Sequence, residues 1–141
     1  MRAILVDDDP VFLKTLTEQL KRNPAVQIVA RASSGVEGLR LAREMQPDIV
    51  IVDQAMPDMN GLEMTHELKM LEPAPRVVVL ALYDEPEYYE GAMRMGADAY
   101  IAKPNVYSEL LPLLRRLQLE TMPQRVRGAS VRRAQAHAYP H

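Results

Sequence analysis

The stretch "ILVDDDP", residues 4–10, places three acidic side chains directly after an apolar run. A continuous apolar run of this kind is typical of a parallel strand that is buried on both faces by helices. Three adjacent carboxylates repel one another, so their position at the edge of a buried segment requires a compensating interaction. The stretch therefore predicts a central strand whose carboxyl end carries a cluster of negative charge.

The chain contains five short segments with strand character, separated by segments with helical periodicity. The five segments are 2–7, 26–32, 48–53, 76–82 and 99–103. Those at 2–7, 48–53 and 76–82 are nearly continuous apolar runs rich in β-branched residues. Alternation of strands and helices predicts right-handed βαβ units and an α/β fold with a five-stranded, doubly wound parallel sheet and five helices.

Each expected helix has apolar residues spaced three or four positions apart, which is typical of a face that packs on a core. The stripes are Phe12, Leu13, Leu16 and Leu20; Val36, Leu39, Ala42 and Met45; Met64, Leu68 and Leu71; Tyr89, Ala92 and Met93; and Leu110, Leu113, Leu114 and Leu117. Pro112 falls inside the last stripe, where it marks either the first turn of a helix beginning near Ser108 or a kink.

The composition is that of one globular domain with an aliphatic core, because 48% of the 141 residues are hydrophobic and only 5% are aromatic. The absence of cysteine excludes disulfides and thiolate metal sites. No apolar run approaches the ~20 residues that cross a bilayer. The apolar segment at the start of the chain is too short for a secretory signal. We therefore expect a cytoplasmic protein that does not contact the membrane.

The charge is distributed unevenly along the chain. All 19 acidic residues precede residue 121, and the segment 121–141 has four arginines and no acid. This change predicts a compact domain at 1–120 followed by a basic linker or tail at 121–141. The arginines could contact nucleic-acid phosphates, but a solvated linker is the preferred interpretation. The chain is then either a stand-alone domain or a fragment cut before an output domain, and we favour the fragment.

In a doubly wound sheet, ligands bind at the carboxyl ends of the strands. Asp7 and Asp8 follow the strand at 2–7, Asp53 ends the strand at 48–53, and Lys103 ends the strand at 99–103. Asp9 precedes Pro10 and a helical pattern, which predicts a helix N-cap with a structural role. Asp7 and Asp8 remain as a functional pair, and carboxylate ligands without Cys or His suit Mg²⁺.

Asp53 would lie between the metal and the Lys103 ammonium. A carboxylate in that setting can attack phosphorus and form an aspartyl phosphate, while the cations offset the charge on the phosphoryl oxygens. The simpler interpretation is that each acid is a strand-end or loop residue without a ligand. The joint occurrence of these residues at three strand ends favours a functional site.

Three motifs of the sequence resemble those of the response-regulator receiver domains of two-component signalling. They are "ILVDDDP", "DIVIVDQAMPDMNGLEM" and "GADAYIAKP", and the resemblance covers residues 2–119. It implies a flavodoxin-like (CheY-like) fold with strand order 2-1-3-4-5, and phosphorylation of Asp53 by a sensor histidine kinase.

The resemblance also implies roles for individual residues. Mg²⁺ would be held by Asp7, Asp8, Asp53 and the backbone carbonyl of Ala55, and Lys103 would pair with the phosphoryl group. Lys103–Pro104 is expected to be a cis peptide bond. Tyr100 occupies the position of an aromatic residue that swings inward on activation.

The same resemblance implies a signalling role rather than catalysis on a released substrate. A phosphorylated receiver would change partners or form a homodimer through the surface of the fourth helix, fifth strand and fifth helix. The protein would bind DNA only through an output domain absent from this chain, and its output would be control of transcription.

Ala81 departs from the pattern of these receivers, which carry Ser or Thr there. The missing hydroxyl removes a hydrogen bond to a charged group, worth ~1.5–3 kcal/mol elsewhere. Ala81 and the bulky Leu82 therefore leave a second hypothesis open, an atypical receiver that acts as a phosphorylation-independent interaction module. A third hypothesis, a flavodoxin-like redox protein, is disfavoured because acids occupy the loop where a flavin phosphate would bind.

Overall fold

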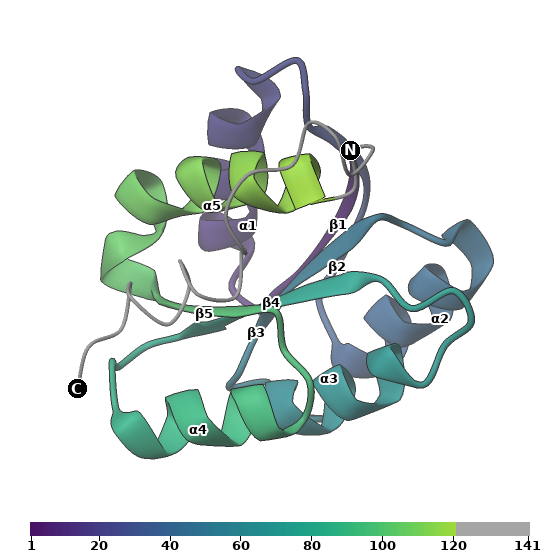
Figure 1. The fold of residues 1–141 in the computed structure, drawn as a ribbon, viewed down its shortest axis with the longest axis vertical. Coiled ribbons are helices and arrows are strands. Elements are labelled where there is room, and N and C mark those ends of the chain that lie inside the picture. The colour runs from purple at the N-terminus through teal and green to yellow at the C-terminus, as the bar shows by residue number, and fades with distance from the viewer. Residues whose placement is uncertain (121–141) are drawn as a thin grey trace.

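The computed structural model describes residues 1–120, which form a parallel sheet covered by helices on both faces (Figure 1). The elements, in chain order, are β1 (Arg2–Val6), α1 (Pro10–Lys21), β2 (Gln27–Ala32), α2 (Gly35–Met45), β3 (Ile49–Asp53), α3 (Gly61–Lys69), β4 (Arg76–Ala81), α4 (Pro86–Arg94), β5 (Ala99–Ala102), a 3₁₀ turn (Lys103–Asn105) and α5 (Val106–Glu120). The expected tail at 121–141 lies outside the described residues.

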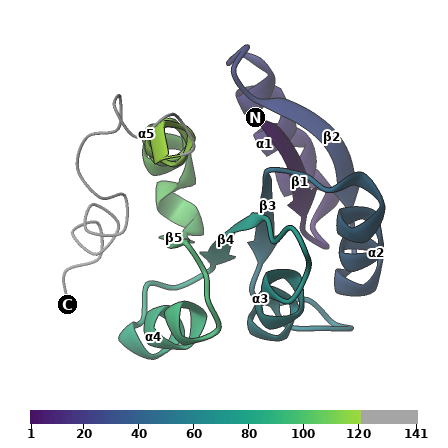
Figure 2. The same ribbon diagram turned by 45° about the vertical axis from the view of Figure 1, so that its right-hand side comes forward.

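All five strands are parallel in the order β2-β1-β3-β4-β5, as predicted. Helices α1 and α5 cover one face, and α2, α3 and α4 cover the other (Figure 1). Figure 2 shows β2 and β5 at opposite ends of the sheet. This order reverses direction at β1 and β3, so the carboxyl ends of β1, β3 and β4 border the crevice where a ligand can enter.

The continuous apolar runs form the centre of the core. Every residue of β3 is buried, and so is every residue of β1 and β4 after the first. Within residues 1–120, no helix combines the length and the apolar character needed to cross a membrane.

The predicted apolar face of α2 is confirmed at Leu39 and Ala42 but was wrong at Val36. Val36 is 61% exposed, whereas Gly35, Gly38, Leu39 and Ala42 face the interior. A Cβ atom at Gly38 would lie 2.7 Å from Cγ2 of Val6, so α2 approaches β1 more closely than a side chain allows. The pattern of hydrophobic residues missed this face because two glycines form part of it.

The structure excludes one of the two alternatives for Pro112 and corrects the expectation for Pro104. Helix α5 begins at Val106, so Pro112 lies in the interior of the helix and not in its first turn, and its ring is exposed. Within residues 1–120 the cis peptide bond is Glu72–Pro73, and Lys103–Pro104 is therefore trans. Lys103 and Pro104 are the first two residues of the 3₁₀ turn that connects β5 to α5.

Candidate functional site

Three carboxylates converge at the carboxyl ends of adjacent strands, as the strand-end argument predicts. Val6 of β1 pairs with Val52 of β3, so the next residues, Asp7 and Asp53, lie side by side. Asp7, Asp8 and Asp53 each offer one carboxylate oxygen, and these three atoms lie within 4.8 Å of one another. The donors are all hard oxygen atoms, which suit a divalent cation such as Mg²⁺.

Lys103 joins this acidic cluster from the end of β5. Its Nζ atom lies 2.8 Å from Oδ2 of Asp7 and 3.4 Å from Oδ1 of Asp53. Asp7 and Asp53 are only 2% and 4% exposed, whereas Asp8 is exposed at the mouth of the cluster. When all four groups are ionised, negative charges exceed positive charges, so the cluster retains an attraction for a second cation.

The electrostatic environment shifts the proton affinity of Asp53. Its burial and the neighbouring Asp7 carboxylate raise the pKa of Asp53 to about 6, although Lys103 acts in the opposite direction. Burial alone would lower the pKa of Lys103, but its hydrogen bond to Asp7 and the charge of Asp53 outweigh this effect, and the pKa is raised. Lys103 therefore remains an ammonium cation at neutral pH.

The three consecutive acids have different roles in the structure. Asp9 is the N-cap of α1, and its Oδ1 atom accepts hydrogen bonds from the backbone N–H groups of Val11 and Phe12. Oδ1 of Asp7 accepts a hydrogen bond from the N–H of Asp9, which fixes the carboxylate of Asp7. The predicted cap at Asp9 is confirmed, and Asp7 and Asp8 remain to face the pocket.

Phe12 is a residue of the site that sequence reasoning assigned only to the core. The Nζ atom of Lys103 lies over the Phe12 ring, 4.5 Å from its centroid. This distance is within the range of a cation–π contact. The spacing of apolar residues in α1 could not reveal the contact between Phe12 and Lys103, because this contact depends on where β5 lies in the fold.

The loop from β3 to α3 is fixed at both ends by short contacts. Its first residues, Gln54 and Ala55, follow Asp53, and the N–H of Ala55 donates a 3.4 Å hydrogen bond to Oδ1 of Asp53. The N–H of Gly61 donates to the carbonyl of Gln54 at 2.7 Å. A Cβ atom at Gly61 would lie 2.6 Å from Cα of Gln54, so the close approach of the two backbones requires glycine there.

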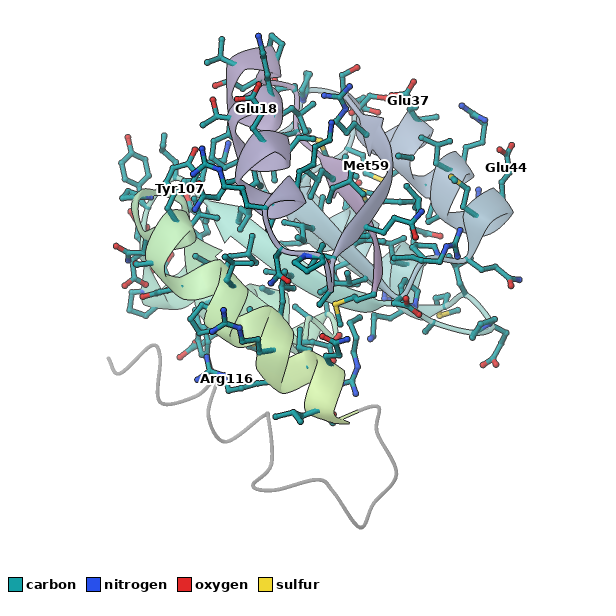
Figure 3. All side chains as sticks on the ribbon, turned by 90° about the horizontal axis from the view of Figure 1, so that it is seen from above. Glu18, Glu37, Glu44, Met59, Tyr107 and Arg116 are labelled. Atoms are coloured by element: carbon teal, nitrogen blue, oxygen red, sulfur yellow. The ribbon has the colours of Figure 1, made fainter. Side chains whose placement is uncertain are left out.

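Asp58, in the same loop, caps a different helix. Its two carboxylate oxygens accept hydrogen bonds from the N–H groups of Gly35 and Val36, the first residues of α2. The bonds from Val36 and Gly35 lower the pKa of Asp58. Met59 lies against Gly35 beside α2 (Figure 3). The loop that carries Ala55 is thus tied to α2, a contact between distant segments that no local pattern indicated.

Ala81 and Tyr100 lie on the same face of neighbouring strands. Ala81 pairs with Ala102, and Tyr100 is two residues before Ala102 on β5. Tyr100 is fully buried, its hydroxyl donates a 2.6 Å hydrogen bond to the carbonyl of Tyr83, and its ring meets that of Tyr89 edge to face. The aromatic ring therefore lies inward beside the small Ala81 side chain.

Three further side chains lie at the protein surface. His66 is exposed on α3. Leu82 is 58% exposed after β4, and Tyr107 projects outward from the first turn of α5 (Figure 3).

Comparisons with known proteins agree with this geometry. The family model described as "Response regulator receiver domain" matches residues 3–115. The nitrate/nitrite response regulator protein NarL of Escherichia coli (strain K12) is 32% identical over 111 residues, which are 79% of this chain and 51% of that protein. The chemotaxis protein CheY of Listeria monocytogenes serovar 1/2a is 30% identical over 104 residues, covering 74% of this chain and 87% of that protein.

Solved structures give the same result for the fold. The response regulator domain of Thermotoga maritima CheB superposes with a TM-score of 0.79 at 28% identity, covering 87% of this chain and 98% of that one. A two-component response regulator of the LuxR family from Aurantimonas sp. SI85-9A1 also gives 0.79 at 28% identity, covering 89% of this chain and 91% of that one. The chain spans about half the length of NarL.

The raised pKa of Asp53 predicts the effect of removing its charge. A carboxyl group with a raised pKa in the folded state holds its proton more tightly there, so its ionisation at neutral pH opposes folding. With a chelator present, Asp53→Asn should raise the free energy of unfolding at neutral pH by about 3 kcal/mol, measured by urea denaturation.

The gain should shrink as the pH falls through 6 and disappear below 3.8, where Asp53 is protonated in both states. Glu18→Gln, which removes an exposed charge from α1, is the control and should change stability by less than about 0.5 kcal/mol. A destabilised Asp53→Asn protein at neutral pH would contradict the electrostatic account.

Proposed function

Because this chain belongs to the family of response regulator receiver domains, we propose that Asp53 accepts a phosphoryl group from a sensor histidine kinase. The observation that carries the proposal is the meeting of Asp7, Asp8 and Asp53 with Lys103 at one edge of the sheet. Asp53 lies beside Asp7, with which it would share the cation, and its Oδ1 atom is 3.4 Å from the ammonium group of Lys103.

The residues present fit a Mg²⁺ ion. Asp7, Asp8 and Asp53 supply oxygen atoms within 4.8 Å of one another, and the exposed Asp8 leaves a route from solvent. Mg²⁺ commonly uses one or two carboxylates and keeps several waters, so this set is sufficient with the carbonyl of Ala55 as a further ligand. When bound, the ion would neutralise the negative charge of the carboxylates and of the phosphoryl oxygens.

In the proposed reaction, a carboxylate oxygen of Asp53 forms a bond to phosphorus as the bond between phosphorus and the kinase histidine breaks. The electron pair of the broken bond stays on the imidazole nitrogen. Lys103 exchanges a carboxylate contact for a phosphoryl oxygen, since its Nζ atom already lies 3.4 Å from Asp53. Attack of water on the phosphorus of the aspartyl phosphate would restore the carboxylate and release phosphate, so no separate substrate is turned over.

The proposed output is control of a further domain. Residues 1–120 would be the receiver, and residues 121–141 would be the basic linker or tail that leads to the output domain. Among the relatives, LiaR of Bacillus subtilis, 29% identical over 115 residues, is named a transcriptional regulatory protein. We place the chain in the cytoplasm with its kinase. Dimerisation would use α4, β5 and α5, where Tyr88 and Tyr107 are exposed, and DNA would be bound through the output domain only.

One observation favours the second candidate function, a phosphorylation-independent interaction module. Tyr100 is fully buried, and its hydroxyl group donates a hydrogen bond to the backbone carbonyl of Tyr83. Ala81 presents no side chain beyond Cβ to oppose this position. In such a module, phosphorylation of Asp53 would leave Tyr100 and the surface around it unchanged.

The first function predicts that Asp53 is modified by a small donor. Incubation of the chain with acetyl phosphate and Mg²⁺ should add the mass of one phosphoryl group, measured on the intact protein. The gain should be lost in Asp53→Asn and with a chelator, whereas Asp58→Asn, outside the proposed ligand set, should retain it. No mass gain in the parent chain, with normal folding, would rule out the phosphoacceptor role.

The position of Tyr100 predicts how Ala81 affects the coupling between phosphorylation of Asp53 and movement of the Tyr100 ring. In protein labelled with fluorotyrosine, the ¹⁹F resonance of Tyr100, assigned with Tyr100→Phe, should not move when Asp53 of the parent is phosphorylated. Ala81→Thr adds a methyl and a hydroxyl group beside the ring, so the resonance should become sensitive to phosphorylation. A large shift on phosphorylation of the parent chain would contradict this account of Ala81.

A further inference from the structure

Within residues 1–120, the ammonium group of Lys103 contacts two anions and one aromatic ring. The anions are Asp7, at 2.8 Å, and Asp53, at 3.4 Å. The third partner is the ring of Phe12, whose centroid lies 4.5 Å from Nζ. The side chain of Lys103 is only 18% exposed, so this contact is largely shielded from water. Cation–π attraction is stronger at such shielded sites than at exposed ones.

The place of Phe12 is determined by the acidic stretch itself. Phe12 lies in the first turn of α1, and its N–H donates a 3.3 Å hydrogen bond to Oδ1 of the N-cap Asp9. Asp9 in turn donates its N–H to Asp7. The ring is therefore held in a defined position relative to the carboxylate that Lys103 contacts.

The two anionic partners are the ones that change during the proposed reaction. A divalent cation competes with Lys103 for the oxygens of Asp7 and Asp53, and a phosphoryl group on Asp53 moves negative charge outward. The aromatic ring is unaffected by either event, because it offers no ligand to a hard cation. Phe12 is thus the one of the three contacts that can hold the ammonium group throughout.

We propose that Phe12 is a positioning residue for phosphoryl transfer, which keeps the ammonium group of Lys103 at the pocket through a cation–π contact. The inference rests on the proposed function of Asp53. Phe12 also packs partly against the core, so a purely structural role is the alternative that a test must separate. The distinction is that a structural role needs apolar volume, whereas positioning needs an aromatic face.

The test compares Phe12→Leu, Phe12→Tyr and the parent chain, with Val11→Ala as a control in the same turn that is 72% exposed. The rate constant for phosphorylation by acetyl phosphate is measured at saturating Mg²⁺. Phe12→Leu should lower it about five-fold, Phe12→Tyr should stay within about two-fold of the parent, and Val11→Ala should not change it. In a Lys103→Met background, Phe12→Leu should cause no further decrease.

NMR of the Lys103 ε-methylene protons gives a readout that does not require phosphorylation. In the parent these protons should be shifted upfield by the ring, and the shift should vanish in Phe12→Leu and persist in Phe12→Tyr. A parent chain that is phosphorylated normally but shows no such shift, or a Phe12→Tyr protein as slow as Phe12→Leu, would overturn the inference alone. A parent chain that cannot be phosphorylated would overturn the proposed function, and the positioning role with it.

Discussion

The structure depends on a concentration of negative charge that the parallel sheet imposes. Strands β1 and β3 are hydrogen-bonded neighbours, so the residues that follow their last pairs, Asp7 and Asp53, are forced together in a largely buried place. Lys103 offsets part of this repulsion from the end of β5, but burial of Asp53 and, after it, the charge of Asp7 still raise the pKa of Asp53. A pocket with excess negative charge favours any event that brings in positive charge, and binding of a divalent cation is the simplest such event.

The surrounding loops hold this pocket in place through contacts between distant segments. Asp9 caps α1 and donates to Asp7, which links the first helix to the acidic pair. Asp58 caps α2 from the loop after β3, and Gly61 allows that loop to close tightly on Gln54. The carboxylates of Asp9 and Asp58 thus satisfy backbone N–H groups at a helix start, where a negative charge is favourable. Loop geometry near Asp53 is therefore tied to the positions of two helices.

The sequence predicted the strands and the convergence of Asp7, Asp8, Asp53 and Lys103, because buried parallel strands read as continuous apolar runs whose ends share one edge of the sheet. The strand order was expected from the resemblance to receiver domains. The cap at Asp9 was also predictable, since Asp followed by Pro is a local signal. Phe12 and Asp58 were missed as parts of the site because their partners, Lys103 and the start of α2, are remote in the chain. Val36 was misplaced because glycines form the packed face of α2. The inward position of Tyr100 depends on the packing of β4, β5 and α4 together.

The central claim is that Asp7, Asp8, Asp53 and Lys103 form one pocket for a divalent cation. Titration of ¹⁵N-labelled protein with Mn²⁺, which prefers the same oxygen ligands as Mg²⁺ and broadens nearby resonances, tests it most directly. We expect the amide signals of residues 7–9, 53–55 and 103 to broaden first, and excess Mg²⁺ to restore them. Broadening that begins at surface acids such as Glu63 and Glu67 of α3, while the signals of the pocket stay sharp, would contradict the account.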